Sequence, residues 1–281
     1  MKKIFYVFCF IVLRYLPTMD AQNCSFNDTD AVETVNDAYL PNSNSLIYTV
    51  RLNLHVMQKD DSSGNFQNTT TDKAYLQQMF DDVNTIYSAN QQPVWNGPQN
   101  DPYLPDTRIR FRIDGIYFHR NSAVCHLKPY NESTGSDVYF NQYGVNIDHS
   151  INIFFVELLY DNGTPYIIRA GNGFGLNGED KNCVGLYSLY YGYLNDPSGS
   201  RYLDPRLIAH ELGHGLGLKH TMASSGKCDE LSDTYCPDVA VVCNYNTDVN
   251  CSNNMMKASS IVNTHKSPRQ MGKMRRLMTV G

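Results

Sequence analysis

The segment Ala209–Thr221, with the sequence AHELGHGLGLKHT, constrains the fold of this chain more than any other. It contains three of the chain's eight histidines. His210 and His214 are four residues apart, so in a helix their imidazoles lie on one face and can converge on one point. The same period predicts an apolar opposite face, made of Ile208, Leu212 and Leu216. We therefore expect a helix that is buried on one face and carries two histidines on the other.

The sequence also predicts where this helix begins and ends. Asp204 is a favourable N-cap, and Pro205 suits the first helical position. Gly217 readily adopts a positive φ, which ends a helix and lets the chain turn. His220 follows three residues later, so it can swing back towards the two helical histidines as a third ligand.

The whole pattern from His210 to His220 is H-E-x-x-H-x-x-G-x-x-H, which is typical of metzincin zinc sites. Neutral imidazoles bind Zn²⁺ well, and a catalytic site needs three protein ligands and an open position. We assign His210, His214 and His220 as the ligands. Glu211 lies about 60° around the helix from His214, so it flanks the ligands and can act on a water without binding the metal. Five fixed positions make a chance match rare.

The segments upstream alternate between strand and helix patterns. Residues 46–58, 107–120 and 151–160 have the composition of strands, residues 183–193 are a further strand candidate, and residues 170–178 form a short, glycine-rich edge segment. Residues 71–90 have the apolar spacing of an amphipathic helix, with Thr71 or Asp72 as its cap. A second helix is expected from Pro268 to Met278. This order predicts a sheet with helices packed against it, of the α/β or α+β class.

The N-terminus predicts export. Lys2 and Lys3 precede an apolar run of about ten residues, Ile4–Leu13, which is too short for a comfortable membrane span. We interpret residues 1–21 as a signal peptide, with a short anchor or a buried strand as the alternative. No other run is long enough for a membrane helix. The net charge is −5, and without a basic run or helix face the sequence argues against nucleic-acid binding.

Cysteine usage agrees with export. Of the eight cysteines, four fall close together, which favours a disulfide-stapled loop over a zinc site because they lack close C-x₂-C pairs. Their pairing stays open between three connectivities. Cys24 is interpreted as a disulfide partner or an incidental thiol, and a latency switch that blocks zinc is the alternative. The clustered cysteines are Cys228, Cys236, Cys243 and Cys251.

From about residue 203 to 280 the chain resembles the pappalysin-like (cytophagalysin-related) metalloendopeptidases. The stretches that carry the resemblance are HELGHGLGLKHT, CDELSDTYCPD, and NNMM followed by KSPRQMGKMRRL. By this resemblance Met256, rather than Met255, is the methionine of the Met-turn beneath the metal. The chain departs from the family pattern at Tyr235, where a proline is usual, and at Ala258, where a tyrosine that supports the transition state is common.

The resemblance implies a metzincin-like α+β fold. It has a twisted, mostly parallel sheet with two long helices, then a disulfide-rich C-terminal subdomain with a Met-turn and a closing helix. After the signal peptide, the expected organisation is a lead-in over residues 22–45 and a catalytic domain over residues 46–281. We divide that domain into an upper part, 46–217, and a lower part, 218–281. The sequence does not indicate an oligomeric state.

The resemblance also implies a secreted zinc endopeptidase acting on proteins or peptides. Zinc would lower the pKa of a water to about 7, and Glu211 would take its proton and pass it to the leaving amine. We expect the substrate strand to dock along an edge near Gly171–Gly178. The alternatives are a secreted zinc-binding adhesion protein, suggested by Ala258, and a zinc hydrolase of non-peptide bonds. Ca²⁺ is a further candidate cofactor at Asp229, Glu230 and Asp233, as against a solvated acidic turn.

Overall fold

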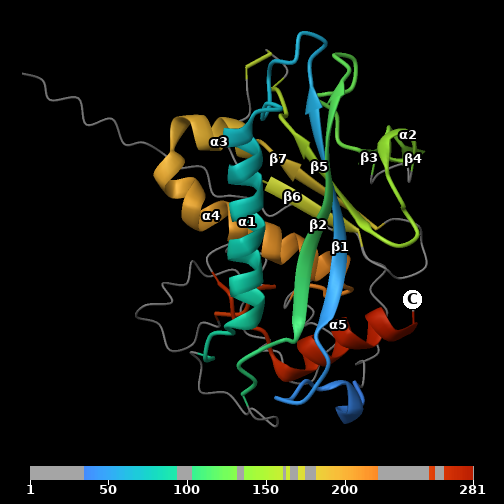
Figure 1. Cartoon of the computed structure of the whole chain (residues 1–281), viewed down its shortest axis with the longest axis vertical. Helices are drawn as coiled ribbons and strands as arrows, with labels where there is room; N and C mark the ends of the chain where they lie inside the picture. The colour runs from blue at the N-terminus through green and yellow to red at the C-terminus, as the bar shows by residue number, and fades with distance from the viewer. Residues whose placement is uncertain are drawn as a thin grey trace, which may run out of the picture.

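The computed structural model of the protein describes residues 35–93, 103–131, 136–160, 163–164, 170–174, 182–220, 253–256 and 263–280. In this part of the chain, strands predominate up to Tyr187, with α1 and α2 between them, and three helices follow (Figure 1). In order, the elements are η1 (Asp37–Tyr39), β1 (Tyr48–Gln58), α1 (Thr70–Ser88), β2 (Ile109–Arg120), β3 (Tyr130–Asn131), β4 (Ser136–Asp137), α2 (Phe140–Tyr143), β5 (Ile151–Val156), β6 (Ala170–Phe174), β7 (Cys183–Tyr187), α3 (Leu189–Asn195), α4 (Pro197–Gly215) and α5 (Pro268–Val280).

The main sheet has five strands in the order β2-β1-β5-β7-β6. The first four are parallel to one another, whereas β6 pairs with β7 in the antiparallel direction. Every residue of β5 is buried, as expected for a central strand that is covered on both faces. The predicted α+β fold with a mostly parallel sheet is confirmed. The glycine-rich segment forms β6, which is the last strand in this order.

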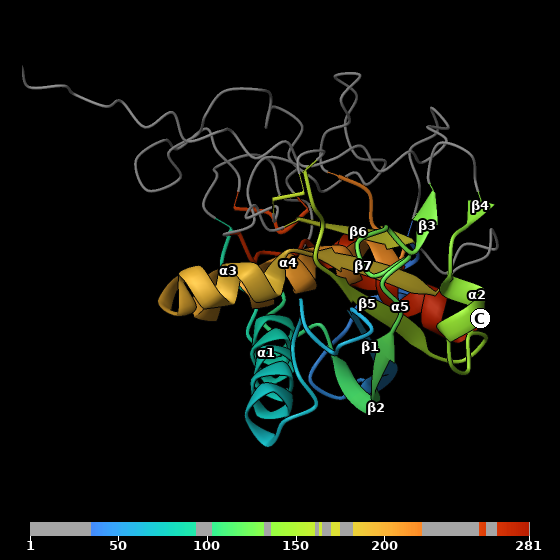
Figure 2. The same ribbon diagram turned by 90° about the horizontal axis from the view of Figure 1, so that it is seen from above.

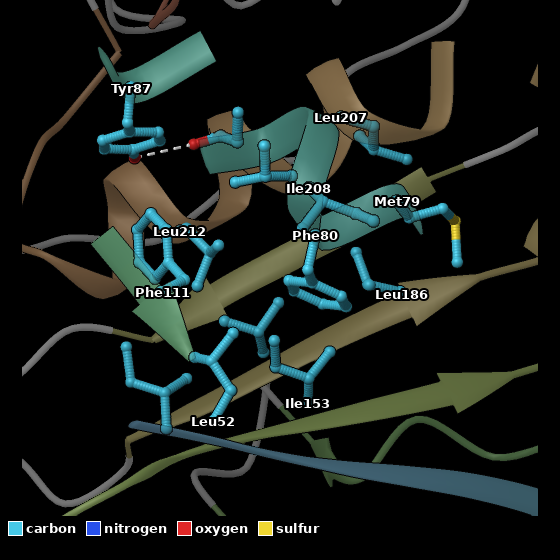
Figure 3. Packing of buried hydrophobic residues seen from close by; sticks show 14 of the residues in the cluster. Leu52, Met79, Phe80, Tyr87, Phe111, Ile153, Leu186, Leu207, Ile208 and Leu212 are labelled. Atoms are coloured by element: carbon cyan, nitrogen blue, oxygen red, sulfur yellow. Dashed lines mark hydrogen bonds between the residues drawn. The ribbon is translucent and has the colours of Figure 1, made fainter. Parts of the chain in front are cut away.

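Helices α1 and α4 pack together beside the sheet, whereas β3, β4 and α2 lie at its other side (Figures 1 and 2). The predicted apolar faces of both helices meet the sheet in one buried cluster. Tyr87 at the end of α1 is fully buried, and its hydroxyl donates a 3.0 Å hydrogen bond to the carbonyl of Ala209 in α4 (Figure 3). The cluster around this contact includes Leu52, Met79, Phe80, Phe111, Ile153, Leu186, Leu207, Ile208 and Leu212.

A second apolar cluster covers the opposite face of the sheet. It includes Tyr139, Phe140, Phe154 and Tyr187. This cover explains why Asn53 and His55, on the polar side of β1, are buried although Arg51 is exposed. His55 of β1 is fully buried there, and its Nε2 lies 2.9 Å from Oδ1 of Asn152.

Helix α5 lies at the end of the sheet where β1 and β2 begin (Figure 1). Arg275 of α5 donates to the carbonyls of Leu46 and Arg108, which precede these two strands. The predicted lead-in, residues 22–45, also contacts α5. Arg269 of α5 donates to the carbonyl of Val35. The predicted closing helix is confirmed, and it extends slightly further than expected.

Two local predictions about these elements differ from the structure. Helix α1 is capped by Thr69, whose hydroxyl accepts from the Asp72 amide at 3.1 Å, and not by Thr71 or Asp72. The strand predicted over residues 183–193 ends at Tyr187, and α3 begins two residues later. Ser188 between them has a left-handed backbone (φ 60°) that breaks the strand.

In the described part of the chain, none of the helices has the length and apolar character that a membrane span requires.

Candidate metal centre

Helix α4 carries the first two predicted ligands and begins earlier than expected. Its N-cap is Asp196, which accepts from the Gly199 amide at 2.8 Å, and Pro197 occupies the first turn. The predicted start at Asp204 and Pro205 is therefore wrong, because residues 196–205 contain two Asp-Pro pairs with the same signal and the helix begins at the earlier one. Asp204 is instead buried inside the helix, where it accepts from the Tyr75 hydroxyl at 3.2 Å.

The three predicted ligands converge. The Nε2 atoms of His210 and His214 lie 3.1 Å apart, and those of His214 and His220 also lie 3.1 Å apart. The third side of this triangle, from His210 to His220, measures 3.2 Å. A tetrahedral zinc ion with Zn–N distances of about 2.0–2.1 Å would hold its nitrogen ligands about 3.3 Å apart. The triangle therefore fits such an ion closely.

The other ring nitrogens of the helical histidines are fixed by backbone carbonyls. Nδ1 of His210 lies 2.7 Å from the carbonyl oxygen of Met255, and Nδ1 of His214 lies 2.7 Å from that of Leu218. Since a carbonyl only accepts, each Nδ1 carries the hydrogen. The lone pair of each neutral ring is then on Nε2, which faces the centre of the triangle. Carbonyls in this position orient ligating histidines in metal sites generally.

Burial keeps the three imidazoles neutral. It lowers the pKa of His210 and lowers that of His214 well below its usual value. Burial, assisted by the neighbouring His210, lowers the pKa of His220 to about 3. A neutral imidazole is the form that binds a metal, so the protein environment favours the ligating state of all three rings at neutral pH.

The turn after α4 brings His220 to the triangle. Gly217 has φ +85°, a conformation that costs other residues free energy because of their Cβ atoms. Its amide donates to the His214 carbonyl at 2.8 Å, and the Leu218 amide donates to the Gly213 carbonyl at 2.9 Å. These two bonds form a Schellman motif. The mechanical role predicted for Gly217 matches this geometry.

Met255 and Met256 lie beneath α4, and both are buried. A Cβ atom at Gly213 would lie 2.6 Å from Sδ of Met256 and 3.1 Å from Cε of Met255. Gly213 therefore leaves room for the methionine turn. Gly215 faces the sheet instead, where a Cβ would meet Ile151 and Val184 at an ordinary 3.7 Å. Met256 provides the atom nearest to the Cβ position at Gly213, whereas Met255 provides the carbonyl for His210.

Glu211 is buried, and it packs against β6. A Cβ atom at Gly171 would lie 2.5 Å from Cγ of Glu211 and 2.9 Å from its Oε1. Only a glycine fits at this close approach between the edge strand and the carboxylate side chain. Sequence reasoning placed Gly171 on a substrate edge but missed its contact with Glu211, because strand-to-helix contacts are not visible in local sequence patterns.

The remaining described histidines lie away from this triangle. Among the residues that the structure describes, His210, His214 and His220 form the one group of three or more metal-binding side chains. His55 and His119 contact each other across β1 and β2, with Nδ1 of His55 at 2.9 Å from Nε2 of His119. His265 is buried beside the carbonyl of Gln91. These contacts agree with the expectation of satisfied core or surface histidines.

Several predicted features fall outside the described residues. They are the signal peptide (1–21), Cys24, the disulfide-rich loop with Cys228, Cys236, Cys243 and Cys251, the acidic stretch Asp229, Glu230 and Asp233, the departures at Tyr235 and Ala258, and the end of the expected substrate edge after Phe174.

Comparison with known families agrees with this geometry. Residues 176–276 match the sequence model of peptidase family M43, described as Pregnancy-associated plasma protein-A. Over these residues the chain resembles the metalloproteases of that family. The match spans the whole histidine motif, the Met-turn and most of α5, so the predicted pappalysin resemblance is confirmed for the part of the chain that carries the site. No curated protein sequence matches the chain.

Solved structures with a similar outline are larger proteins. Metalloproteinase-II from Bacteroides fragilis is 16% identical, with a TM-score of 0.39 over 83% of this chain and 55% of its own. A chain from the structure of a chaperone-substrate complex is 13% identical, with a TM-score of 0.38 over 80% of this chain and 35% of its own. Wild-type OgpA from Akkermansia muciniphila is 17% identical, with a TM-score of 0.31 over 69% and 56%. The chain thus spans about half the length of the first of these structures.

Proposed function

We propose that this protein is a zinc-dependent endopeptidase that hydrolyses peptide bonds in proteins or peptides. The observation that carries the proposal is the triangle of Nε2 atoms from His210, His214 and His220, with sides of 3.1–3.2 Å. Three neutral imidazoles leave one position of a tetrahedral metal open, which is the donor set of a catalytic zinc site rather than a closed structural one. The M43 family match supports the same reaction class.

The metal, when bound, supplies a water of lowered pKa and polarises the substrate carbonyl. The chain supplies the remaining functions. The Nδ1–H groups of His210 and His214 are held by carbonyls, so both rings keep a fixed orientation towards the metal position.

Glu211 is the proposed general base and acid. It directly follows His210 near the C-terminal end of α4, and its place against Gly171 limits the positions that its carboxylate can take. In the proposed reaction it accepts a proton from the attacking water. It then delivers that proton to the leaving amine.

We propose that β6 binds the substrate. It is the last strand in the sheet order, and among the described residues it pairs only with β7. An extended peptide can add to such an edge through main-chain hydrogen bonds. Gly171 lies on this strand directly against Glu211, so a peptide on β6 would pass beside the proposed base. This arrangement favours hydrolysis of an extended peptide over the non-peptide alternative.

Export is part of the proposal. Residues 1–21 have the basic start and short apolar run of a signal peptide. Secretion would also provide the oxidising environment that the cysteine cluster favours. We propose no calcium site at Asp229, Glu230 and Asp233, because no observation beyond the sequence supports one there.

The test compares wild-type protein with Glu211→Gln. Both proteins are loaded with one equivalent of zinc and assayed on an unstructured protein such as casein, with and without a chelator. We expect Glu211→Gln to bind zinc as the wild type does but to lose hydrolysis. A chelator should stop the wild-type reaction, and added zinc should restore it. Full activity in Glu211→Gln would contradict the role of the base, whereas wild-type zinc binding without proteolysis would favour the adhesion alternative.

A further inference from the structure

Two buried amides lie between the Met-turn and helix α5. Asn254 is 3% exposed and Gln270 is fully buried. Nδ2 of Asn254 donates to Oε1 of Gln270 at 2.9 Å, and Nε2 of Gln270 donates back to Oδ1 of Asn254 at 3.2 Å. This reciprocal pair links the Met-turn to α5, in addition to the isolated β-bridge between Asn254 and His265.

Each amide oxygen in the pair also accepts a backbone hydrogen bond. Oδ1 of Asn254 accepts from the Met256 amide at 2.9 Å, and Oε1 of Gln270 accepts from the Ser267 amide at 3.0 Å. Ser267 in turn accepts from the Gln270 amide at 3.2 Å through its hydroxyl. Ser267 and Gln270 therefore form a capping box at the start of α5. The Gln270 side chain serves the helix cap with its oxygen and the Met-turn with its nitrogen.

The Met-turn is the segment that orients the first histidine. The Met255 carbonyl accepts from Nδ1 of His210 at 2.7 Å. The Met255 amide donates to the His265 carbonyl at 2.7 Å. The Met-turn is thus held from two directions. Asn254 bonds Gln270 and accepts from the Met256 amide, and the His265 carbonyl binds the Met255 amide. A shift of this turn would move the carbonyl away from His210.

We propose that Asn254 and Gln270 are positioning residues for the metal ligand His210. They contact neither the metal position nor the substrate. They act by holding the Met255 carbonyl where it fixes the tautomer and orientation of the His210 ring. This inference rests on the metal centre of the proposed function. It gives the S-P-x-Q start of α5 a role that helix capping alone does not explain.

Gln270→Glu separates these two roles. Glutamate caps a helix at this position as well as glutamine does, and its oxygens can still accept from Ser267 and from Nδ2 of Asn254. It lacks the hydrogens that Oδ1 of Asn254 needs. Turning the Asn254 amide over does not help, because its nitrogen would then face the Met256 amide. The variant therefore keeps the cap and loses one of the two hydrogen bonds that link Gln270 to the turn.

Ser267→Ala is the matched control. It removes the hydroxyl that accepts from Gln270, at a cost of about 1 kcal/mol for a lost cap, while the Asn254–Gln270 pair stays intact. If Gln270→Glu does not accumulate as a folded protein, Asn254→Asp tests the same pair from the other side. It keeps the acceptor for Met256 and loses the donor to Gln270.

The readouts are the zinc dissociation constant, from competition with a chromophoric chelator, and the visible spectrum of the cobalt-substituted protein, which reports ligand geometry. Loss of a partner outside the ligand shell weakens metal binding by about 10–100-fold. We expect about tenfold weaker zinc binding and a changed cobalt spectrum in Gln270→Glu. Ser267→Ala should stay within twofold of wild type and keep its spectrum.

Two results would overturn the inference while leaving the metal centre in place. One is a Gln270→Glu protein with the wild-type dissociation constant and cobalt spectrum. The other is an equal loss in Ser267→Ala, which would assign the effect to helix capping. Absence of zinc binding by the wild-type protein would instead overturn the metal centre and this inference together.

Discussion

Gly171→Ala provides a sharp test of how the fold places the proposed base. The added Cβ would lie 2.5 Å from Cγ and 2.8 Å from Cδ of Glu211. Carbon atoms in ordinary contact are about 3.5–4.0 Å apart, so the strand or the glutamate must move by about 1 Å. Misplacement of a catalytic group by about 1 Å costs about 100-fold in rate. We therefore expect kcat to fall by about two orders of magnitude.

The three atoms nearest this position all belong to Glu211 and none to the proposed ligands, so zinc affinity should stay close to that of the wild type. The assay measures kcat and KM on an unstructured protein or a quenched fluorescent peptide, together with zinc affinity and the thermal midpoint. A fall in kcat at unchanged zinc affinity separates misplacement of Glu211 from loss of the metal.

Gly215→Ala is the matched control within the same site. Its Cβ would meet Ile151 and Val184 at 3.7 Å, which is an ordinary contact. Alanine is also favoured over glycine in a helix by up to about 1 kcal/mol. This variant should keep wild-type activity and be at least as stable. A Gly171→Ala protein with kcat within threefold of the wild type would refute the reasoning about Glu211.

Three further predictions concern the scaffold around the site. Gly217→Ala places a Cβ on a residue with φ +85°, which costs about 1–2 kcal/mol. Denaturant unfolding should show this loss of stability. Zinc titration should show weaker binding, because the turn carries His220. Tyr87→Phe removes the buried bond to the Ala209 carbonyl and should cost about 1–3 kcal/mol in the same unfolding assay, with little change in zinc affinity. Burial raises the pKa of Glu157 to about 8, so the folded protein holds a proton that the unfolded chain releases near pH 4–5. The free energy of unfolding should then fall as pH rises towards 8, by at most about 1.4 kcal/mol per pH unit. Glu157→Gln should flatten this slope. A variant with the same slope as the wild type would contradict the buried, protonated state of Glu157.

The sequence predicted the histidine helix and its turn because both follow from local rules. The spacing of His210 and His214 fixes their shared face, and Gly217 marks the position after the helix where the chain needs a positive φ. The strands were predictable for a similar reason. A fully buried strand such as β5 reads as a continuous apolar run, and β2 reads as an alternation.

The start of α4 was not predictable from its capping signal, because two Asp-Pro pairs carry that signal equally. The choice between them depends on Asp204, which is buried against Tyr75 of α1. A contact between two helices decides this question, and such a contact has no local signature.

The residues that surround the proposed metal ligands and base were also not predictable from the sequence. Gly171, Asn254 and the Met255 carbonyl act through contacts between segments that are far apart in the chain. One local signal was present. The sequence from Ser267 to Gln270 has the capping-box pattern S-x-x-Q, which would have predicted the cap of α5 but not the bond from Gln270 to the Met-turn.

The most direct test of the central claim is a zinc titration of the metal-free wild-type protein, with proteolysis measured at each point. The account predicts that activity rises linearly and reaches its plateau at one zinc per chain. His220→Ala should bind zinc much more weakly and show no activity at the same zinc concentration. Proteolysis that is independent of added zinc, or a wild-type protein that binds none, would contradict the account.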